Sequence, residues 1–177
     1  ASKTKSESEA SLPQTLVPPP AAPAPPAPAG PWRYSASYDR LGRGVVRTAT
    51  TESLNTVNFG FPYDGPQRAR LVMRINADDS GDALIILEQG QILLDSFSEG
   101  PVYVRFDNRP VMRYLVNYPA DHSRDMVFIQ DAYNFGSYIQ SGKLARIQLT
   151  VYKEASPTFE FDISGFDLRR LSSMRPE

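Results

Sequence analysis

The chain has 177 residues, a net charge of −1 and no cysteine. This length allows one ordinary domain or two very small ones. The near-neutral charge gives no field that would indicate nucleic acid or an acidic membrane surface as a partner. The lack of cysteine excludes disulfides, thiol catalysis and Cys-ligated zinc.

The first 31 residues differ in composition from the remainder. Residues 1–31 hold nine of the 16 prolines and no aromatic residue, whereas every Phe, Tyr and Trp lies from Trp32 onward. Such a segment lacks the apolar surface needed for a core. We therefore predict a disordered Pro/Ala-rich tail or tether at 1–31, a single domain at 32–171 and a frayed end at 172–177.

Short segments with period-two alternation follow one another through the domain, and this alternation predicts strands. A turn at 61–65 is expected to close the strand at 54–61, and a short arm at 91–94 to follow the strand at 83–87. The main predicted strands are 32–38, 45–51, 54–61, 71–75, 83–87, 102–106, 111–118, 126–129, 143–153 and 158–163.

The segment at 69–95 is the strongest structural signal in the chain. Two apolar arms, 71–75 and 83–87, flank a polar run of Asn, Ala, Asp, Ser and Gly at 76–82. Residues of these types tolerate turn dihedrals, so the segment predicts a central hairpin with an exposed tip.

Only one segment has the spacing of a helix. Residues 131–142 offer Asp131 as an N-cap, Tyr138 and Ile139 three and four residues after Phe135, and Gly142 as a C-cap. A further helical turn is expected at 167–171. About nine strands with one short helical insert predict an all-β, mainly antiparallel β-sandwich, with a small β-barrel as the alternative.

No local motif indicates catalysis. His122, the only histidine, lies in a polar loop, and neither a GxSxG nucleophile turn nor a phosphate-binding glycine loop occurs. We therefore assign no catalytic residue and no cofactor, and expect neither enzymatic activity nor a small-molecule substrate.

Asp78, Asp79 and Asp82 at the hairpin tip are weak candidates for a hard cation. Their spacing differs from that of a calcium-binding loop, and Asp is a common turn residue. We favour a plain turn, and expect replacement of the three by Asn or Ser to leave folding nearly unchanged.

Aromatic residues near predicted loops are candidates for contacts with a protein partner. They fall into two groups, Phe61 with Tyr63 and Tyr133 with Phe135. The same residues also suit a core position, and that alternative is favoured.

Five short motifs are distributed through the predicted domain: Trp32-x-Tyr34, Phe61-Pro62-Tyr63-x-Gly65, Gly90-Gln91, Val104-Arg105-Phe106-Asp107 and Phe159-x-Phe161-Asp162-x-Ser164-Gly165. Together they resemble a family of small envelope proteins of Gram-negative bacteria. The resemblance implies a periplasmic or outer-membrane-tethered β-domain, and it carries no catalytic residue to this chain. A membrane contact is expected only through a lipid anchor upstream of Ala1.

Two functions from different classes are compatible with these features. The first is a non-catalytic interaction or accessory module of an envelope or secretion assembly, held on a Pro-rich linker. The alternative is an inhibitor or immunity-type protein that blocks an exported hydrolase such as a lysozyme. Ser80 and Gly81 match the start of a Ser-Gly inhibitor loop, although the aromatic residue expected after them is absent.

Overall fold

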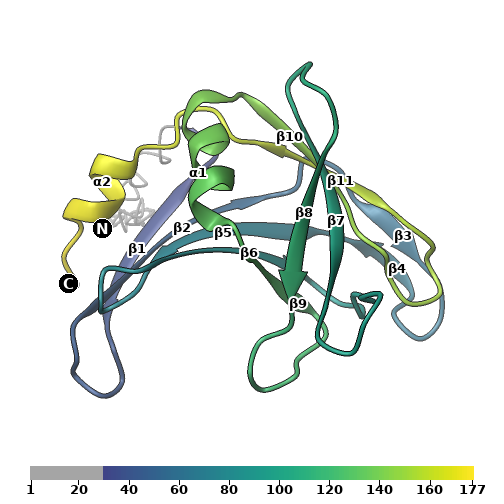
Figure 1. The fold of residues 1–177 in the computed structure, drawn as a ribbon, viewed down its shortest axis with the longest axis horizontal. Helices are drawn as coiled ribbons and strands as arrows, with labels where there is room; N and C mark the ends of the chain where they lie inside the picture. The colour runs from purple at the N-terminus through teal and green to yellow at the C-terminus, as the bar shows by residue number, and fades with distance from the viewer. Residues whose placement is uncertain (1–29) are drawn as a thin grey trace, which may run out of the picture.

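The computed structural model describes residues 30–177. The disordered tail expected at 1–31 lies almost entirely outside these residues. Eleven strands and two helices make up the described part (Figure 1). In chain order they are β1 (Arg33–Tyr38), β2 (Val45–Glu52), β3 (Val57–Phe59), β4 (Gly65–Gln67), β5 (Ala69–Ile75), β6 (Gly81–Leu87), β7 (Glu99–Phe106), β8 (Met112–Asn117), β9 (Met126–Ile129), α1 (Ala132–Ser141), β10 (Leu144–Gln148), β11 (Thr158–Asp162) and α2 (Leu168–Ser173).

The all-β, mainly antiparallel class is confirmed. Nine strands form one sheet in the order β1-β2-β5-β6-β9-β8-β7-β10-β11, and β3 pairs with β4 in a separate two-stranded sheet. Every pair in the main sheet is antiparallel. The two layers expected of a sandwich are thus halves of one continuous sheet, whose strands change direction progressively from β1 to β11 (Figure 1).

The curled sheet is joined at one end but does not close into a barrel. Beyond the end of β2, Ser53 forms an isolated bridge with Phe161 of β11, and the Leu54 N–H donates to the Glu160 carbonyl over 2.7 Å. The Thr51 hydroxyl also donates to the Asp162 carbonyl. Strand β1 lies on the same side of β2 but has no strand on its outer edge among the described residues.

The central hairpin forms as expected from its sequence. Strand β5 pairs with β6 from Ala69 opposite Leu87 to Ile75 opposite Gly81. Leu71 and Ile85 are fully buried at the middle of this pair. Because Leu, Val and Ile fill both arms, the hairpin contributes a broad apolar surface to the core.

A single hydrophobic cluster joins both halves of the sheet. It includes Leu71 and Ile85 from one half and Val104, Ile147 and Phe161 from the other. Alternate residues of β10 and the segment after it point inward: Ala145, Ile147, Leu149 and Val151 are all buried.

Four details differ from the prediction. The turn at Phe61–Tyr63 leads into a strand, β4, so that β3 and β4 form a small hairpin of their own. The arm at 91–94 makes only an isolated bridge between Ile92 and Val151. The segment at 143–153 pairs only as far as Gln148. The expected helical turn after Asp167 is a second helix, α2.

Helix α1 confirms the predicted insert and its caps. The Asp131 side chain accepts from the Asn134 N–H at 3.1 Å, and the Gly142 N–H donates to the Tyr138 carbonyl. Neither helix among residues 30–177 is long and apolar enough to cross a membrane.

Candidate functional site

The most site-like feature of the described residues is a groove between the two helices, on the inner face of the β5–β6 hairpin. We call it the interhelix groove. Its volume is about 270 Å³. Strand residues form its floor, α1 one wall, and the Phe166–Leu171 segment the other. The lining residues are Met73, Arg74, Ile75, Gly81, Asp82, Ala132, Tyr133, Gly136, Ser137, Gln140, Phe166, Leu168 and Leu171.

Helix α1 has a glycine on the side that faces the sheet. Gly136 is buried, and a Cβ placed there would lie 3.4 Å from the Met73 Cε. From sequence, a glycine inside a helix indicates weakness. Here it faces the Met73 side chain of β5, with Phe135 and Ile139 buried on either side of it.

Helix α2 is held in place by contacts to the start of the domain. Its cap residue Asp167 donates its N–H to the Tyr34 hydroxyl at 2.8 Å, and the Arg170 guanidinium lies 4.4 Å from the Tyr34 ring centre. Behind it, Phe166 packs on Trp32 with ring centres 5.0 Å apart. These contacts place Leu168 and Leu171 along the groove.

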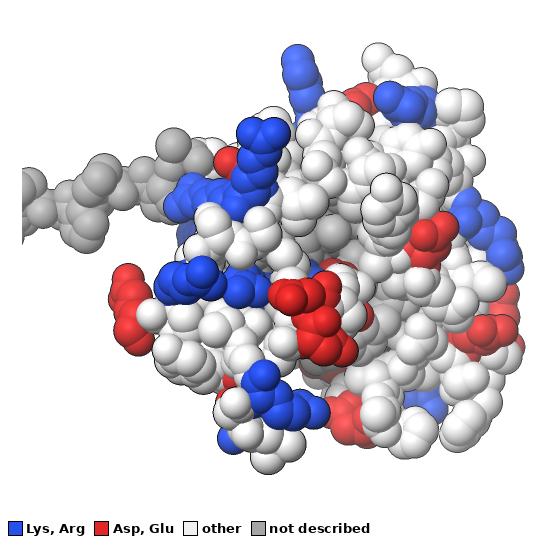
Figure 2. Space-filling view, turned by 60° about the vertical axis from the view of Figure 1, so that its left-hand side comes forward, with Lys and Arg blue, Asp and Glu red and all other residues white. Residues whose placement is uncertain are grey.

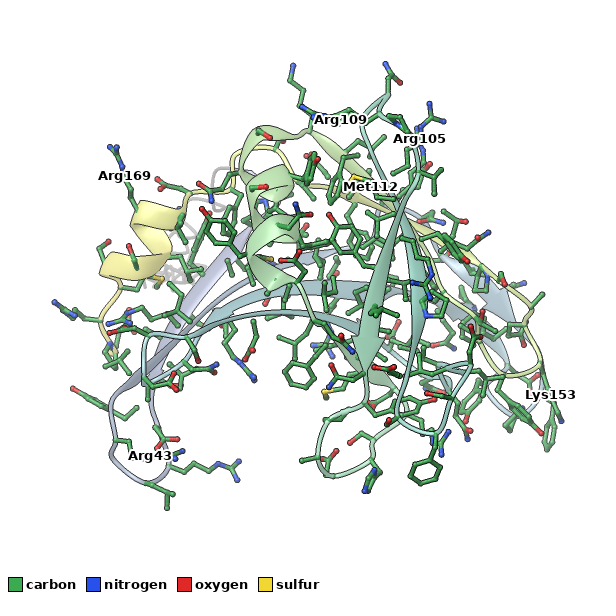
Figure 3. The ribbon with its side chains drawn as sticks, in the orientation of Figure 1. Arg43, Arg105, Arg109, Met112, Lys153 and Arg169 are labelled. Atoms are coloured by element: carbon green, nitrogen blue, oxygen red, sulfur yellow. The ribbon has the colours of Figure 1, made fainter. Side chains whose placement is uncertain are left out.

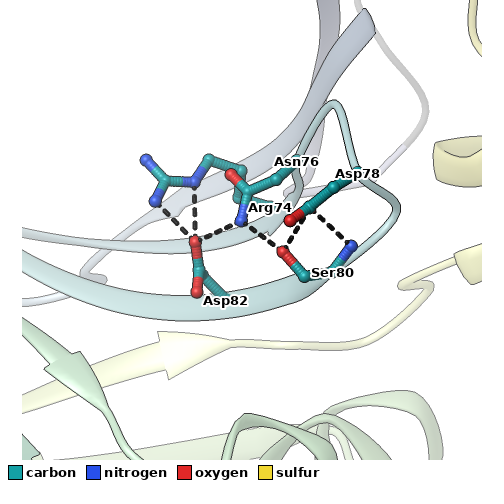
Figure 4. A network of polar contacts seen from close by, with 5 residues as sticks. All are labelled: Arg74, Asn76, Asp78, Ser80 and Asp82. Carbon is teal, nitrogen blue, oxygen red and sulfur yellow. Dashed lines mark hydrogen bonds and ion pairs between the residues drawn. The ribbon is translucent and has the colours of Figure 1, made fainter. Parts of the chain in front are cut away.

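A polar network lies at the hairpin end (Figure 4). One oxygen of Asp82 accepts three hydrogen bonds: from Arg74 Nε at 3.1 Å, from Arg74 Nη2 at 2.5 Å and from Asn76 Nδ2 at 2.7 Å. The Arg74 guanidinium also lies 5.3 Å from the Phe128 ring centre. Arginine and aspartate therefore neutralise each other at this end of the hairpin.

The other two tip carboxylates are engaged separately. Asp78 accepts from both the N–H and the hydroxyl of Ser80, and these two hydrogen bonds hold the pKa of the Asp78 carboxyl below its usual value. Asp79 lies 3.6 Å from Arg47 Nη1. The three side chains thus point to different partners, and residues 30–177 contain no group of three acidic or histidine side chains arranged to hold a metal ion.

The structure brings together only some of the residues selected from sequence. Tyr133, with 92% of its surface exposed, stands at the groove rim together with Gly81 and Asp82. Ser80 lies beside them on the exposed tip. Phe135, in contrast, is fully buried against Phe106 and Tyr114, so it is a core residue and offers no surface to a partner.

The other aromatic pair lies apart from the groove, on the β3–β4 hairpin. Phe61 is 74% exposed, and the Lys153 ammonium lies 5.6 Å from its ring centre. Tyr63 is half-buried against the core, and its carbonyl accepts from the Gln67 amide. These residues do not line the groove.

Sequence reasoning missed the α2 side of the groove. Phe166, Leu168 and Leu171 follow the last strand, and only the capping residue Asp167 signalled a helix there. The Arg74–Asp82 pair was also missed. It follows from the hairpin register, in which Ile75 lies opposite Gly81 and Arg74 therefore lies opposite Asp82.

Exposed basic side chains are spread around the molecule. Arg43, Lys153 and Arg169 point outward from different parts of the molecule, and Arg105 and Arg109 from a fourth (Figure 3). A nucleic-acid-binding surface gathers its basic residues on one face or along one groove. The expectation that nucleic acid is not a partner stays a prediction.

The residues that carry the family resemblance have structural roles. Trp32, Phe106, Phe159 and Phe161 are fully buried. Gly90 has a φ of +124°, and a Cβ there would approach the Phe59 ring to 2.8 Å.

The sequence matches no family model and no curated protein. Among solved structures, the chain is similar to the crystal structure of invasion associated protein B from Bartonella henselae, with a TM-score of 0.51 and 17% sequence identity. The similarity covers 81% of this chain and 93% of that one. At this identity the likeness shows a shared fold.

Proposed function

We propose that this chain is a non-catalytic protein-interaction module of the bacterial cell envelope, in the periplasm or associated with the outer membrane. Its interhelix groove receives an apolar side chain of a protein partner. The envelope location rests on the sequence resemblance, and the binding mode rests on the groove.

The observation that carries the binding mode is the combination of an apolar floor with an exposed aromatic rim. Met73 and Ile75 line the floor, Leu171 lines one wall, and Tyr133 stands beside them with 92% of its surface exposed. Aromatic side chains at a rim provide large contact area at low entropic cost, which is why they recur as anchors in interfaces. Tyr133 has no packing role of comparable size in the folded chain.

The size of the groove suits one side chain. Pockets for drug-sized ligands enclose roughly 300–1,000 Å³, and this groove of about 270 Å³ is close to the lower end of that range. One large apolar side chain, such as Leu or Phe, fits such a volume. Arg74 and Asp82 are the two charged residues in the lining, and they pair with each other, so the partner segment is expected to be apolar at its centre.

The test is comparative capture from an envelope fraction, using the full chain and two arginine variants. Leu168→Arg places a charge in the groove at a residue that is already 42% exposed, so it preserves the fold. Phe61→Arg is the matched control, because Phe61 is another exposed apolar residue outside the groove. A partner retained by the unmodified chain and by Phe61→Arg, but lost with Leu168→Arg and weakened by Tyr133→Ala, supports the proposal.

Loss of the partner with Phe61→Arg instead would place the interface on the β3–β4 hairpin and contradict the proposed binding in the groove. Far-UV circular dichroism checks that each variant is folded.

The hydrolase-inhibitor alternative has one observation in its favour, the exposure of the tip residues 78–81. The Ser80 hydroxyl is already used there: it donates to Asp78 at 2.6 Å and accepts from Asn76 at 3.0 Å. An inhibitor loop that needs this hydroxyl would have to break both contacts. A lysozyme assay with micromolar protein tests the alternative, and undiminished lysozyme activity would eliminate it for that enzyme.

A further inference from the structure

Strand β1 presents a free backbone edge at the margin of the main sheet. It pairs with β2 from Arg33 opposite Thr50 to Tyr38 opposite Val45, and no other strand of the described residues pairs with it. The free edge runs past the side of the molecule that also carries α2 (Figure 1).

The backbone groups on this edge can be identified from the hairpin register. The Asp39 N–H donates to the Gly44 carbonyl, which makes this pair a hydrogen-bonded one. Antiparallel pairs alternate between bonded and non-bonded positions. Ser35 and Ser37 therefore bond to β2, whereas the N–H and C=O groups of Tyr34, Ala36 and Tyr38 point away from it.

Among residues 30–177, this edge lacks the usual protection of edge strands. Proteins commonly block such edges with Lys, Pro, a bulge or a covering segment. Residues 34–38 are Tyr-Ser-Ala-Ser-Tyr, with none of the blocking residues, and they pair with β2 in unbroken register. Helix α2 does not cover the edge, because it packs on the inner face: Arg170 lies over the Tyr34 ring, and the Met174 carbonyl accepts from Arg47 of β2.

The sequence of β1 is complementary to itself when reversed. Residues 33–39 read Arg-Tyr-Ser-Ala-Ser-Tyr-Asp, so the central five residues are the same in both directions and the flanking residues carry opposite charges. A second copy laid antiparallel about Ala36 places Tyr34 opposite Tyr38 and Arg33 opposite Asp39, each of them twice. Tyr38, now 70% exposed, would be covered by the facing Tyr34.

We infer that strand β1 is a self-association surface whose partner is a second copy of this chain, paired antiparallel about Ala36. The two sheets join across a two-fold axis, as expected for an isologous contact. Ala36 faces Ala36 in a bonded pair, which continues the alternation of Tyr34, Ala36 and Tyr38 along the edge. The interface is one strand wide, so it belongs to the small, concentration-dependent class.

The charge distribution on this side of the molecule is compatible with such pairing. Acidic and basic side chains are interspersed there, with broad uncharged areas between them (Figure 2). The exposed Arg33 side chain meets Asp39 of the other copy, whose carboxylate already accepts from Arg43 at 2.7 Å. A carboxylate binds two guanidinium groups readily, so both contacts can persist.

Single-cysteine variants of the full chain test the register directly, because the chain has no other thiol. In the proposed dimer, the two Ala36 Cα atoms lie about 5.5 Å apart, within the range that a disulfide bridges. The two copies of residue 38 are offset by four positions, or roughly 14 Å. Ala36→Cys should form a disulfide-linked dimer under mild oxidation, whereas Tyr38→Cys, on the same face and more exposed, should not.

Light scattering over a concentration series gives a second measurement that needs no cysteine. The unmodified chain should shift from one to two chains per particle as concentration rises. Arg33→Glu places like charges opposite Asp39 at two sites and should weaken this association at least tenfold. Arg113→Glu, an equal change of charge at an exposed site on β8, should leave it within twofold.

The inference is overturned if the unmodified chain stays monomeric at every concentration. It is also overturned if both cysteine variants cross-link equally, or if neither does while both remain folded by circular dichroism. A chain whose β1 edge is occupied by a strand of another protein would give this result, in which neither cysteine variant cross-links. The proposal does not depend on the groove, so either can fail alone.

Discussion

Trp32 is the residue whose removal tests the fold most directly. It is 1% exposed, its ring packs on Phe166, and its Nε1 donates to the Ile163 carbonyl at 3.2 Å. It therefore joins the first strand to the last segment of the chain. Truncation leaves a cavity at this junction and an unpaired buried carbonyl.

Two substitutions separate these contributions. Trp32→Ala should cost about 3–5 kcal/mol of the free energy of unfolding, as large-to-small changes of buried aromatics do. Trp32→Phe keeps most of the packing but loses the hydrogen bond, and should cost about 1–2 kcal/mol. At roughly 2–4 °C per kcal/mol for a domain of this size, the alanine variant should melt about 6–20 °C lower.

Urea unfolding followed by far-UV circular dichroism is the suitable assay, because Trp32 is the only tryptophan and its fluorescence disappears with it. Tyr133→Ala is the control, since an aromatic side chain with 92% of its surface exposed should contribute less than about 0.5 kcal/mol. A cost below about 1 kcal/mol for Trp32→Ala would refute the assigned role of this junction.

Three further predictions concern other parts of the molecule. Burial raises the pKa of Tyr114 to about 12, so its neutral form is favoured in the folded state. The free energy of unfolding should therefore fall as pH rises from about 10 to about 12. Tyr114→Phe should flatten this fall, as measured by urea unfolding at each pH. Gly100→Ala places a Cβ 2.7 Å from the Asp95 nitrogen and should cost about 1–3 kcal/mol, measured by thermal melting; an unchanged melting temperature would show that the loop after Leu94 yields freely. Asp82→Asn should lower the free energy of unfolding by about 1 kcal/mol because the Asp82 carboxylate accepts three hydrogen bonds, and Asp78→Asn should lower it by less than half of that. A chelator should leave the melting temperature of the unmodified chain unchanged. A clear drop with chelator would instead indicate a bound cation at the tip.

The expectation that all three tip aspartates are interchangeable with Asn or Ser needs revision at one position. Asp78 serves the turn by accepting from Ser80, a role that Asn also fills. Asp82 lies beyond the turn on β6, where it pairs with Arg74 of the facing strand. Its partner is set by hairpin register, so turn propensity gives no information about it.

The sequence by itself determined much of the local structure. Two apolar arms around a polar run predicted the β5–β6 hairpin, and alternation of apolar residues predicted the strand that became β10. Capping chemistry predicted α1 to the residue, with Asp131 and Gly142 at its ends. These features depend on contacts within a few residues.

Only the tertiary structure decided how the strands combine and where surfaces remain free. Nothing local distinguishes two stacked sheets from one curled sheet, because the same alternation serves both. The groove joins Met73, Tyr133 and Leu171, which lie far apart in the chain. The free edge of β1 exists because β11 meets β2 beyond Glu52 instead of pairing alongside β1. Tyr133 and Phe135 show the same division: two residues apart and alike in sequence, one lies at the rim and the other in the core, because only helix packing decides which side of α1 faces the sheet.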